Sequence, residues 1–267
     1  MDRKKYIKEC KRVVIKVGTT SLTYLNGKIN ISKIDRLARV ITDITNSGKE
    51  VILVSSGAIA VGSDRLNLEQ RPRDTIGKQA ASAVGQVFLI QLYERMFAQY
   101  NRKVAQILLT RSVFDNDVRK KNAGNTIDKL LELGVVPIVN ANDTVTTDEL
   151  TEFSDNDTLS AYVAVAGKAN LLVILSDIDA LYTADPNKDP DARKIDVVEE
   201  VDDTIYSIAG DAGSKLGTGG MVTKVKAAAL LMKRGIGMVI ASGNEPNILY
   251  DILGGKSEGT FFAKNNE

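Results

Sequence analysis

Short runs of apolar, mostly β-branched residues recur along the chain. These runs cover residues 13–17, 51–55, 104–109, 135–140, 171–175 and 238–241, and a last short run covers 259–262. Most are continuous rather than alternating in polarity, which is typical of strands covered on both faces of a sheet. The pattern therefore predicts a central sheet between layers of helices.

Helical patterns lie between these strands. They cover residues 32–47, 75–100, 122–133 and 157–166, and a further helix is expected from Val222 onward. Ser32 is the expected N-cap of the first, and Gly85 marks a potential break in the long second one. Because strands and helices alternate, we predict the α/β class, with a mainly parallel sheet that binds ligands at the carboxyl ends of its strands.

The composition is that of an ordinary globular domain. Of the 267 residues, 43% are hydrophobic and 26% are charged, and the net charge is +1. This balance creates no overall field that would draw nucleic acid or a membrane surface, and no apolar run reaches transmembrane length. The length fits one large α/β domain or two small ones. A cytoplasmic location is expected, because no signal-peptide core follows the N-terminus and the single cysteine, Cys10, permits no internal disulfide.

The sequence contains no histidine. This excludes Ser-His-Asp and Cys-His nucleophilic machinery, histidine metal ligands and phosphohistidine chemistry. An enzyme with this sequence would have to use Lys, Arg, Asp, Glu, hydroxyl groups and the backbone. A reaction whose acceptor is already an anion would need no general base.

Polar residues of similar kinds follow four of the predicted strands. They occupy residues 16–21, 55–58, 140–143 and 176–177. Because the carboxyl ends of parallel strands lie at one edge of a sheet, these groups could face a single crevice. Loops are commonly polar and glycine-rich, which explains one or two of the groups. The recurrence of small residues, amides, carboxylates and a lysine at the same edge favours a binding site.

A glycine-rich stretch, residues 217–224, runs directly into a helical pattern. Its glycines let backbone N–H groups turn toward one point, and Lys224 adds a positive charge in the first turn. Free N–H groups and the macrodipole at a helix start favour an anion. The stretch is either a phosphate site or a surface turn before an ordinary helix, and the P-loop spacing is absent.

Two connecting segments are long enough to matter for function. Residues 142–158 carry acidic and hydroxyl side chains and could form a hairpin, whose end at 154–157 would cap the next helix. Residues 182–190 contain several turn-forming residues, including two prolines, and are expected to form a loop.

Six of these stretches, in this order, resemble the motifs of one family. They are residues 14–19, 55–60, 140–143, 155–157, 181–186 and 217–224. Together they make the chain similar to the glutamate 5-kinases, within the amino acid kinase superfamily, over nearly its whole length.

The resemblance implies a three-layer αβα sandwich with a mainly parallel central sheet. It implies a single domain, 1–267, with an acceptor-binding lobe at about 1–168 and an ATP-binding lobe at about 169–267. It also implies the short form, without the C-terminal RNA-modification-type domain of many relatives.

The activity that this resemblance implies is ATP-dependent phosphorylation of the side-chain carboxylate of L-glutamate, the first step of proline biosynthesis. L-proline would be a feedback inhibitor, and a homo-oligomer is expected. Mg²⁺ would be held largely by the ATP phosphates and water, so no dedicated metal residues are predicted. A carboxylate acceptor is ionised at neutral pH and needs no base, which suits a chain without histidine.

The same resemblance gives each motif a role. Lys16 and Lys224 would contact the transferring phosphoryl group, and Asp157 would orient them. The residues implied for glutamate are Ser56, Gly57, Asp143 and Asn156. The residues implied for ATP are Lys16, Ser176, Asp177, Thr218, Gly219, Gly220, Met221, Val222, Thr223 and Lys224.

The chain departs from the family pattern in three places. Ala141 stands where Glu is usual, Ser176 stands where Thr is usual, and the segment between Asp143 and Asp157 is one residue longer. These departures concern the binding of glutamate and proline rather than the reaction.

Three alternatives remain open from the sequence. An N-acetylglutamate kinase would favour a Lys-x-Gly-Gly opening, which the stretch at 16–19 lacks. A nucleotide kinase would need arginines for the acceptor phosphate, for which Arg71 and Arg73 are candidates. A non-catalytic amino-acid sensor would have no need to retain both lysines and Asp157.

Overall fold

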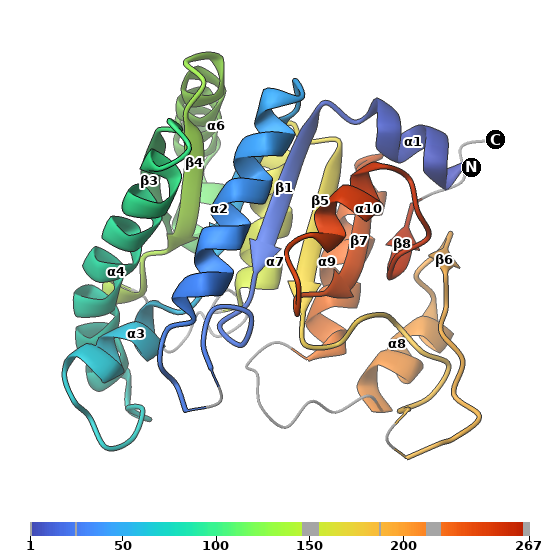
Figure 1. Ribbon diagram of the computed structural model, residues 1–267. Helices are drawn as coiled ribbons and strands as arrows, with labels where there is room; N and C mark the ends of the chain where they lie inside the picture. The colour runs from blue at the N-terminus through green and yellow to red at the C-terminus, as the bar shows by residue number, and fades with distance from the viewer. Residues whose placement is uncertain (1, 25, 146–154, 187, 212–219, 264–267) are drawn as a thin grey trace.

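The structure is a computed structural model that describes residues 2–24, 26–145, 155–186, 188–211 and 220–263. In this part of the chain one eight-stranded sheet lies between two layers of helices (Figure 1). The strands are β1 (Arg12–Val17), β2 (Glu50–Ser55), β3 (Val104–Leu109), β4 (Val136–Ala141), β5 (Leu171–Ser176), β6 (Val197–Val198), β7 (Gly237–Ser242) and β8 (Thr260–Phe262). The predicted three-layer αβα sandwich is confirmed.

The strand order is β3-β4-β2-β1-β5-β7-β8-β6. The first six strands of this order are parallel, β8 runs antiparallel to β7, and β6 is parallel to β8. Within the register, Lys16 on β1 lies between Val54 on β2 and Ile174 on β5. The carboxyl ends of the parallel strands therefore meet at one edge of the sheet, which is the lower edge in Figure 1.

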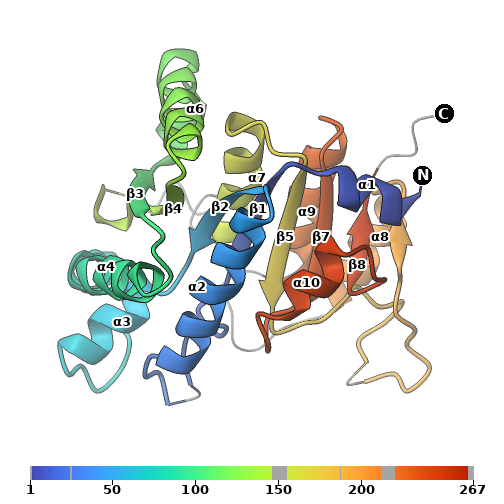
Figure 2. The ribbon, with the colours of Figure 1, turned by 45° about the horizontal axis from the view of Figure 1, so that its top comes forward.

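Helices cover both faces of the sheet, as Figures 1 and 2 show. They are α1 (Arg3–Glu9), α2 (Ile31–Asn46), α3 (Ala58–Arg65), α4 (Thr75–Ala98), α5 (Arg111–Phe114), α6 (Asp117–Glu132), α7 (Asn156–Ala166), α8 (Asp203–Asp211), α9 (Met221–Met232) and α10 (Ile248–Leu253), with a 3-10 turn η1 (Asp143–Val145). One apolar core joins α1, α2, α4 and α10 to one face of the sheet, and a second joins α6, α7 and α9 to the other. Among the described residues, no helix combines the length and apolarity that a membrane span needs.

The predicted strands agree with the observed ones to within about one residue at each end. The helices differ more. The N-cap of α2 is Asn30, not Ser32, and its side chain accepts a hydrogen bond from the backbone N–H of Lys33 at 3.0 Å. This prediction was wrong because the helix begins at Ile31, whose exposed side chain does not join the apolar stripe. The hairpin expected within 142–158 falls mostly on 146–154, outside the described residues.

The break expected near Gly85 is absent, because α4 runs unbroken from Thr75 to Ala98. Glycine serves a different purpose there. A Cβ atom on Gly85 would lie 1.8 Å from the carbonyl oxygen of Ala58 on α3, and one on Gly62 would lie 1.7 Å from that of Ala81 on α4. The backbones of α3 and α4 are therefore in direct contact, which larger side chains would prevent.

Candidate functional site

Both lysines that the sequence indicated meet at one carboxylate. Lys16, near the end of β1, places Nζ 2.6 Å from Oδ1 of Asp157. Lys224, in the first turn of α9, places Nζ 2.9 Å from Oδ2 of the same side chain. All three side chains are buried, Asp157 completely. The structure thus brings these residues together in one charge cluster at the carboxyl ends of the strands.

This Lys16–Asp157–Lys224 cluster holds two ammonium groups and one carboxylate, so it carries one positive charge in excess. Burial by itself would raise the pKa of Asp157, but the two lysines outweigh burial and hold its pKa below the usual value. Asp157 is therefore ionised at neutral pH. The buried carboxylate of Asp155 lies close enough to interact with Lys16 and offsets part of this charge when it is ionised. The two ammonium groups are the groups that an anion would contact.

The first turn of α7 positions Asp157. Asp155, within the stretch 154–157 that was predicted to cap this helix, is its N-cap, and its Oδ1 accepts a hydrogen bond from the backbone N–H of Asp157 at 3.1 Å. Thr223 of α9 adds a hydroxyl 3.3 Å from Oδ2 of Asp157. Burial, and then the nearby charge of Asp157, raise the pKa of Asp155. The carboxylate that holds the lysines is thus fixed from both α7 and α9.

Asn156, the residue before Asp157, points its amide toward the end of β2. Its Nδ2 lies 2.7 Å from Oγ of Ser56, 3.2 Å from the carbonyl oxygen of Ser55 and 3.0 Å from Oδ1 of Asn140 on β4. Gly57 follows with φ +104°, a left-handed conformation that favours glycine, and α3 begins directly after it. Two of the side chains expected for glutamate, Ser56 and Asn156, are therefore in contact.

Asp143 lies in η1, just beyond β4. Its Oδ2 accepts a hydrogen bond from Oγ of Ser82 on α4 at 2.7 Å. Burial raises the pKa of Asp143, and the bond to Ser82 offsets only part of this effect. Its carboxylate is thus held in a setting that favours a cationic partner.

The residues expected for ATP follow β5 and precede α9. Ser176 ends β5 and donates a hydrogen bond to Oδ1 of Asp177 at 2.9 Å. Gly220 is the N-cap of α9. The side chain of Met221 is buried in the core, so only its backbone could face a ligand, and Val222 is partly buried. Thr218 and Gly219 lie outside the described residues.

Sequence reasoning missed the polar side chains that α4 sends to the same place. Ser82 contacts Asp143, and Gln86 accepts a hydrogen bond from Nδ2 of Asn140 at 2.8 Å. Both are buried. The one available signal was their spacing of four residues, which puts them on a single face of the helix.

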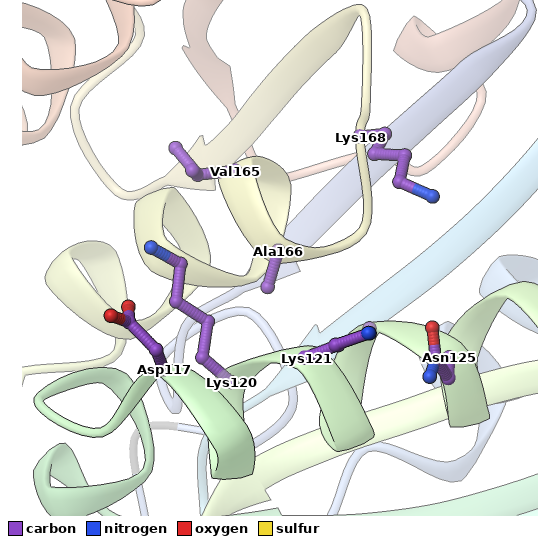
Figure 3. A pocket seen from close by; sticks show the side chains of 8 residues that line it. Asp117, Lys120, Lys121, Asn125, Val165, Ala166 and Lys168 are labelled. Carbon is purple, nitrogen blue, oxygen red and sulfur yellow. The ribbon is translucent and has the colours of Figure 1, made fainter.

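A separate hollow of about 370 Å³ lies between α6 and α7 (Figure 3). It is lined by Asp117, Lys120, Lys121, Gly124, Asn125, Val165, Ala166 and Lys168. None of these belongs to the motifs at the strand ends, and the ammonium group of Lys168 is paired with Asp128 at 2.8 Å. The hollow is therefore distinct from the candidate site.

A metal cage built only from protein groups does not fit the described residues. They contain no group of three or more Cys, Asp or Glu side chains that could hold an ion. Both oxygens of Asp157 are engaged by lysines. The cluster suits a ligand that brings its own counter-ion.

Comparison with known proteins gives a consistent result. The sequence model of the amino acid kinase family matches residues 11–242. The chain is 50% identical over 268 aligned residues to glutamate 5-kinase of Clostridium perfringens (strain 13 / Type A), covering 99% of this chain and 100% of that relative. It is 47% identical to glutamate 5-kinase of Listeria innocua serovar 6a, covering 98% of this chain and 96% of that relative.

Solved structures share the fold at low sequence identity. Carbamate kinase from Giardia lamblia bound to AMP-PNP superposes with a TM-score of 0.66 at 17% identity, covering 97% of this chain and 100% of that one. UMP kinase from Bacillus anthracis superposes with a TM-score of 0.64 at 15% identity, covering 96% and 97%. These likenesses extend the agreement in fold to proteins of distant sequence.

Proposed function

The chain belongs to the amino acid kinase family and, within it, to the glutamate 5-kinases, and on that premise we propose that it transfers the γ-phosphoryl group of ATP to the side-chain carboxylate of L-glutamate. The observation that carries the proposal is the Lys16–Asp157–Lys224 cluster, with its excess positive charge at the strand ends. Phosphoryl transfer depends mainly on positioning and on neutralising the charge of the phosphoryl oxygens. The cluster supplies both from rigid elements.

On the donor side, Lys16 and Lys224 contact the phosphoryl group, while Asp157 keeps the two ammonium groups together. The start of α9 at Gly220 adds free backbone N–H groups and the positive end of the helix macrodipole. We assign the nucleotide to the lobe at 169–267, with Ser176, Asp177 and the stretch 218–224 around it. For Ser176 and Asp177 this assignment rests on their place at the end of β5, and for residues 220–224 on their place at the start of α9. Thr218 and Gly219 are assigned from the family resemblance alone.

On the acceptor side, Ser56, Gly57, Asp143 and Asn156 bind glutamate within the lobe at 1–168. The half-buried carboxylate of Asp143 suits the α-ammonium group of the substrate. Asn156 and Asp157 are consecutive, so the acceptor and donor sides meet at the first turn of α7. This adjacency supports direct transfer between the two substrates.

The chemical step needs no proton acceptor. A carboxylate oxygen of glutamate forms the new bond to the γ-phosphorus, and the bond from that phosphorus to the β–γ bridging oxygen breaks, leaving ADP. The attacking carboxylate is ionised at neutral pH, so a chain without histidine can carry out the reaction. The lysines stabilise the charge that develops on the transferred oxygens.

Mg²⁺ is proposed to reach the site with ATP, bound to phosphate oxygens and water, where it neutralises phosphate charge. The donor set fits this arrangement because the lysines already occupy both oxygens of Asp157. The protein's own contribution is then to orient the nucleotide through Lys16, Lys224 and the N–H groups of α9.

Two further properties belong to this proposal. L-proline is proposed to inhibit by occupying the acceptor site, since it carries the same α-carboxylate and an ammonium group. The chain is also proposed to form a homo-oligomer. The outward face of α4 supports this, because Ile76, Val84 and Val87 expose 78%, 40% and 58% of their surface there.

The test is ADP release with L-glutamate, N-acetyl-L-glutamate, L-aspartate and UMP as acceptors. We expect turnover with L-glutamate alone, and a loss of about 100-fold or more in kcat for Lys16→Met and Lys224→Met, because each removes a charge at the developing phosphoryl charge. Lys121→Met, in the α6–α7 hollow, is the matched control and should keep the wild-type rate. Near-normal turnover in both Lys16→Met and Lys224→Met would contradict the assignment of these lysines to the phosphoryl group. Faster turnover with another acceptor would show that L-glutamate is not the substrate.

A further inference from the structure

Three polar side chains on α4 point at the strand ends through an otherwise apolar helix face. Ser82 bonds to Asp143, Gln86 bonds to Asn140, and the hydroxyl of the fully buried Tyr93 lies 2.9 Å from Oγ of Ser55. They occupy positions i, i+4 and i+11, which lie on one side of an α-helix. Apolar side chains would pack there at less cost, since buried polar groups must be fully paired.

Gln86 is part of a chain of amides whose orientation is fixed by two backbone groups. The N–H of Ala141 can only donate, and it bonds to Oδ1 of Asn140 at 2.9 Å. The Nδ2 of Asn140 must then face the other way, where Oε1 of Gln86 accepts from it at 2.8 Å. Gln86 therefore holds the far end of the Asn140 amide in place.

The next amide in the chain is Asn156. The carbonyl oxygen of Ser55 can only accept, so the group of Asn156 that faces it is Nδ2. Oδ1 of Asn140 accepts from the same Nδ2 at 3.0 Å. All donor capacity of Asn156 is thus used within the protein, and its buried Oδ1 has no hydrogen-bond partner in the described part of the chain.

We propose that Gln86 and Ser82 are positioning residues that make the acceptor site selective for a substrate with a free ammonium group. Gln86 acts through Asn140 on Asn156, whose Oδ1 is left as an acceptor. Ser82 holds the carboxylate of Asp143 through the bond at 2.7 Å. The unpartnered Oδ1 of Asn156 and the carboxylate of Asp143, which only one hydroxyl engages, match an ammonium group and penalise a substrate that lacks one. The inference rests on the proposed function, because it deepens the description of the glutamate site.

The test compares L-glutamate with glutarate, which has both carboxylates but no amine. Wild-type protein is expected to prefer L-glutamate in kcat/KM by about 100-fold or more. Gln86→Met keeps the length of the side chain but loses the acceptor. We expect it to raise the KM for glutamate about 10-fold and to leave kcat and the KM for ATP within about twofold of the wild-type values. The ratio of kcat/KM for glutamate to kcat/KM for glutarate should then fall about 10-fold.

Gln86→Glu retains an acceptor for Asn140 and is expected to restore the ratio to within about threefold of wild type. Ser82→Ala removes the hydroxyl that holds Asp143 and should also narrow the ratio of kcat/KM for glutamate to that for glutarate. This variant tests the proposal if Gln86→Met fails to fold. Leu89→Val, a buried apolar change on the same helix, controls for lost stability and should leave the ratio unchanged.

A purely structural role would lower kcat/KM for both acceptors equally. An unchanged ratio in Gln86→Met and Ser82→Ala, with active wild-type protein, would therefore overturn the positioning role alone. Wild-type protein that does not release ADP with L-glutamate would overturn the proposed function as well. Thermal unfolding of every variant separates these outcomes from misfolding.

Discussion

A single buried carboxylate organises the charged residues of the site. Moving Asp157 out of water is costly, and the two lysines compensate by pairing with both of its oxygens. The same contacts limit the freedom of the long lysine side chains, which are otherwise rich in rotamers. The ammonium groups are thus positioned before any nucleotide binds.

Asp143 gives the residue-scale prediction of pH dependence. Its pKa is raised by burial above the usual value of about 3.9, and only the ionised form attracts the substrate ammonium. As pH falls through the raised pKa, the carboxylate is protonated, so kcat/KM for glutamate should fall at a higher pH than for an ordinary aspartate. The measurement is kcat/KM between pH 4.5 and 8 for wild type and Asp143→Asn.

Asp143→Asn is also the control for the titration of glutamate itself. Its kcat/KM should be lower throughout and less dependent on pH, and its KM for ATP should be nearly unchanged. Parallel pH profiles for the two proteins would show that another group titrates. A raised KM for ATP in place of glutamate would show that Asp143 is misplaced.

At the scale of elements, the contact between α3 and α4 determines where the acceptor residues lie. α3 begins two residues after Ser56, and α4 carries Ser82 and Gln86 on either side of Gly85. Because the two backbones touch at Gly85, the polar side of α4 lies against the ends of β2 and β4. The glycine thus supports the site through the packing of the two helices.

Gly85→Ala is predicted to destabilise the protein and to raise the KM for glutamate. Its Cβ would meet the Ala58 carbonyl oxygen at 1.8 Å and force the helices apart, which should lower the unfolding free energy by about 1–3 kcal/mol.

Gly210→Ala on α8 is the matched control. No atom of the described residues lies within 4 Å of its new Cβ, so helix propensity should make it neutral or stabilising by up to about 1 kcal/mol. Urea unfolding measures the change in unfolding free energy, and steady-state kinetics measure the KM for glutamate. A Gly85→Ala protein as stable as wild type would contradict the backbone contact between α3 and α4.

The elements also show what the sequence could and could not predict. Continuous apolar runs identify buried strands in a sequence. The predicted bounds of six strands therefore agree with the observed bounds to within about one residue. α6 begins at Asp117, five residues before the predicted start at Asn122, because its first turns are charged and expose Val118. Periodicity detects a buried stripe, and a surface helix has little of one. β6, with two residues, is too short to give a pattern.

At the scale of the whole molecule, the parallel sheet explains why the site could be anticipated. Strand ends that are far apart in the sequence share one edge, so Lys16 and Asp143 were expected to face the same crevice. Ser82 and Gln86 could not be found in this way. A polar residue in a helix pattern usually faces water, and only the packing of α4 on the sheet turns these two inward.

Inhibition by L-proline is the prediction at this scale. Proline offers the α-carboxylate and ammonium group of an amino acid but no side-chain carboxylate, so it can occupy the acceptor site without reacting. Millimolar proline at low glutamate should reduce ADP release, and saturating glutamate should restore it, because occupancy is mutually exclusive. Asp143→Asn should weaken proline inhibition and glutamate affinity together. Inhibition that glutamate cannot relieve would place the proline site elsewhere.

The consecutive placement of Asn156 and Asp157 has a geometric consequence. On the proposed assignment, one side chain faces the acceptor and the next holds the lysines that face the donor, so the two sides of the site are anchored at neighbouring residues. Neighbouring α-carbons are held 3.8 Å apart by covalent bonding alone. The first turn of α7 therefore fixes how far apart the backbone anchors of the two sides of the site can lie. Loop motions can alter how readily each substrate enters without changing this backbone spacing.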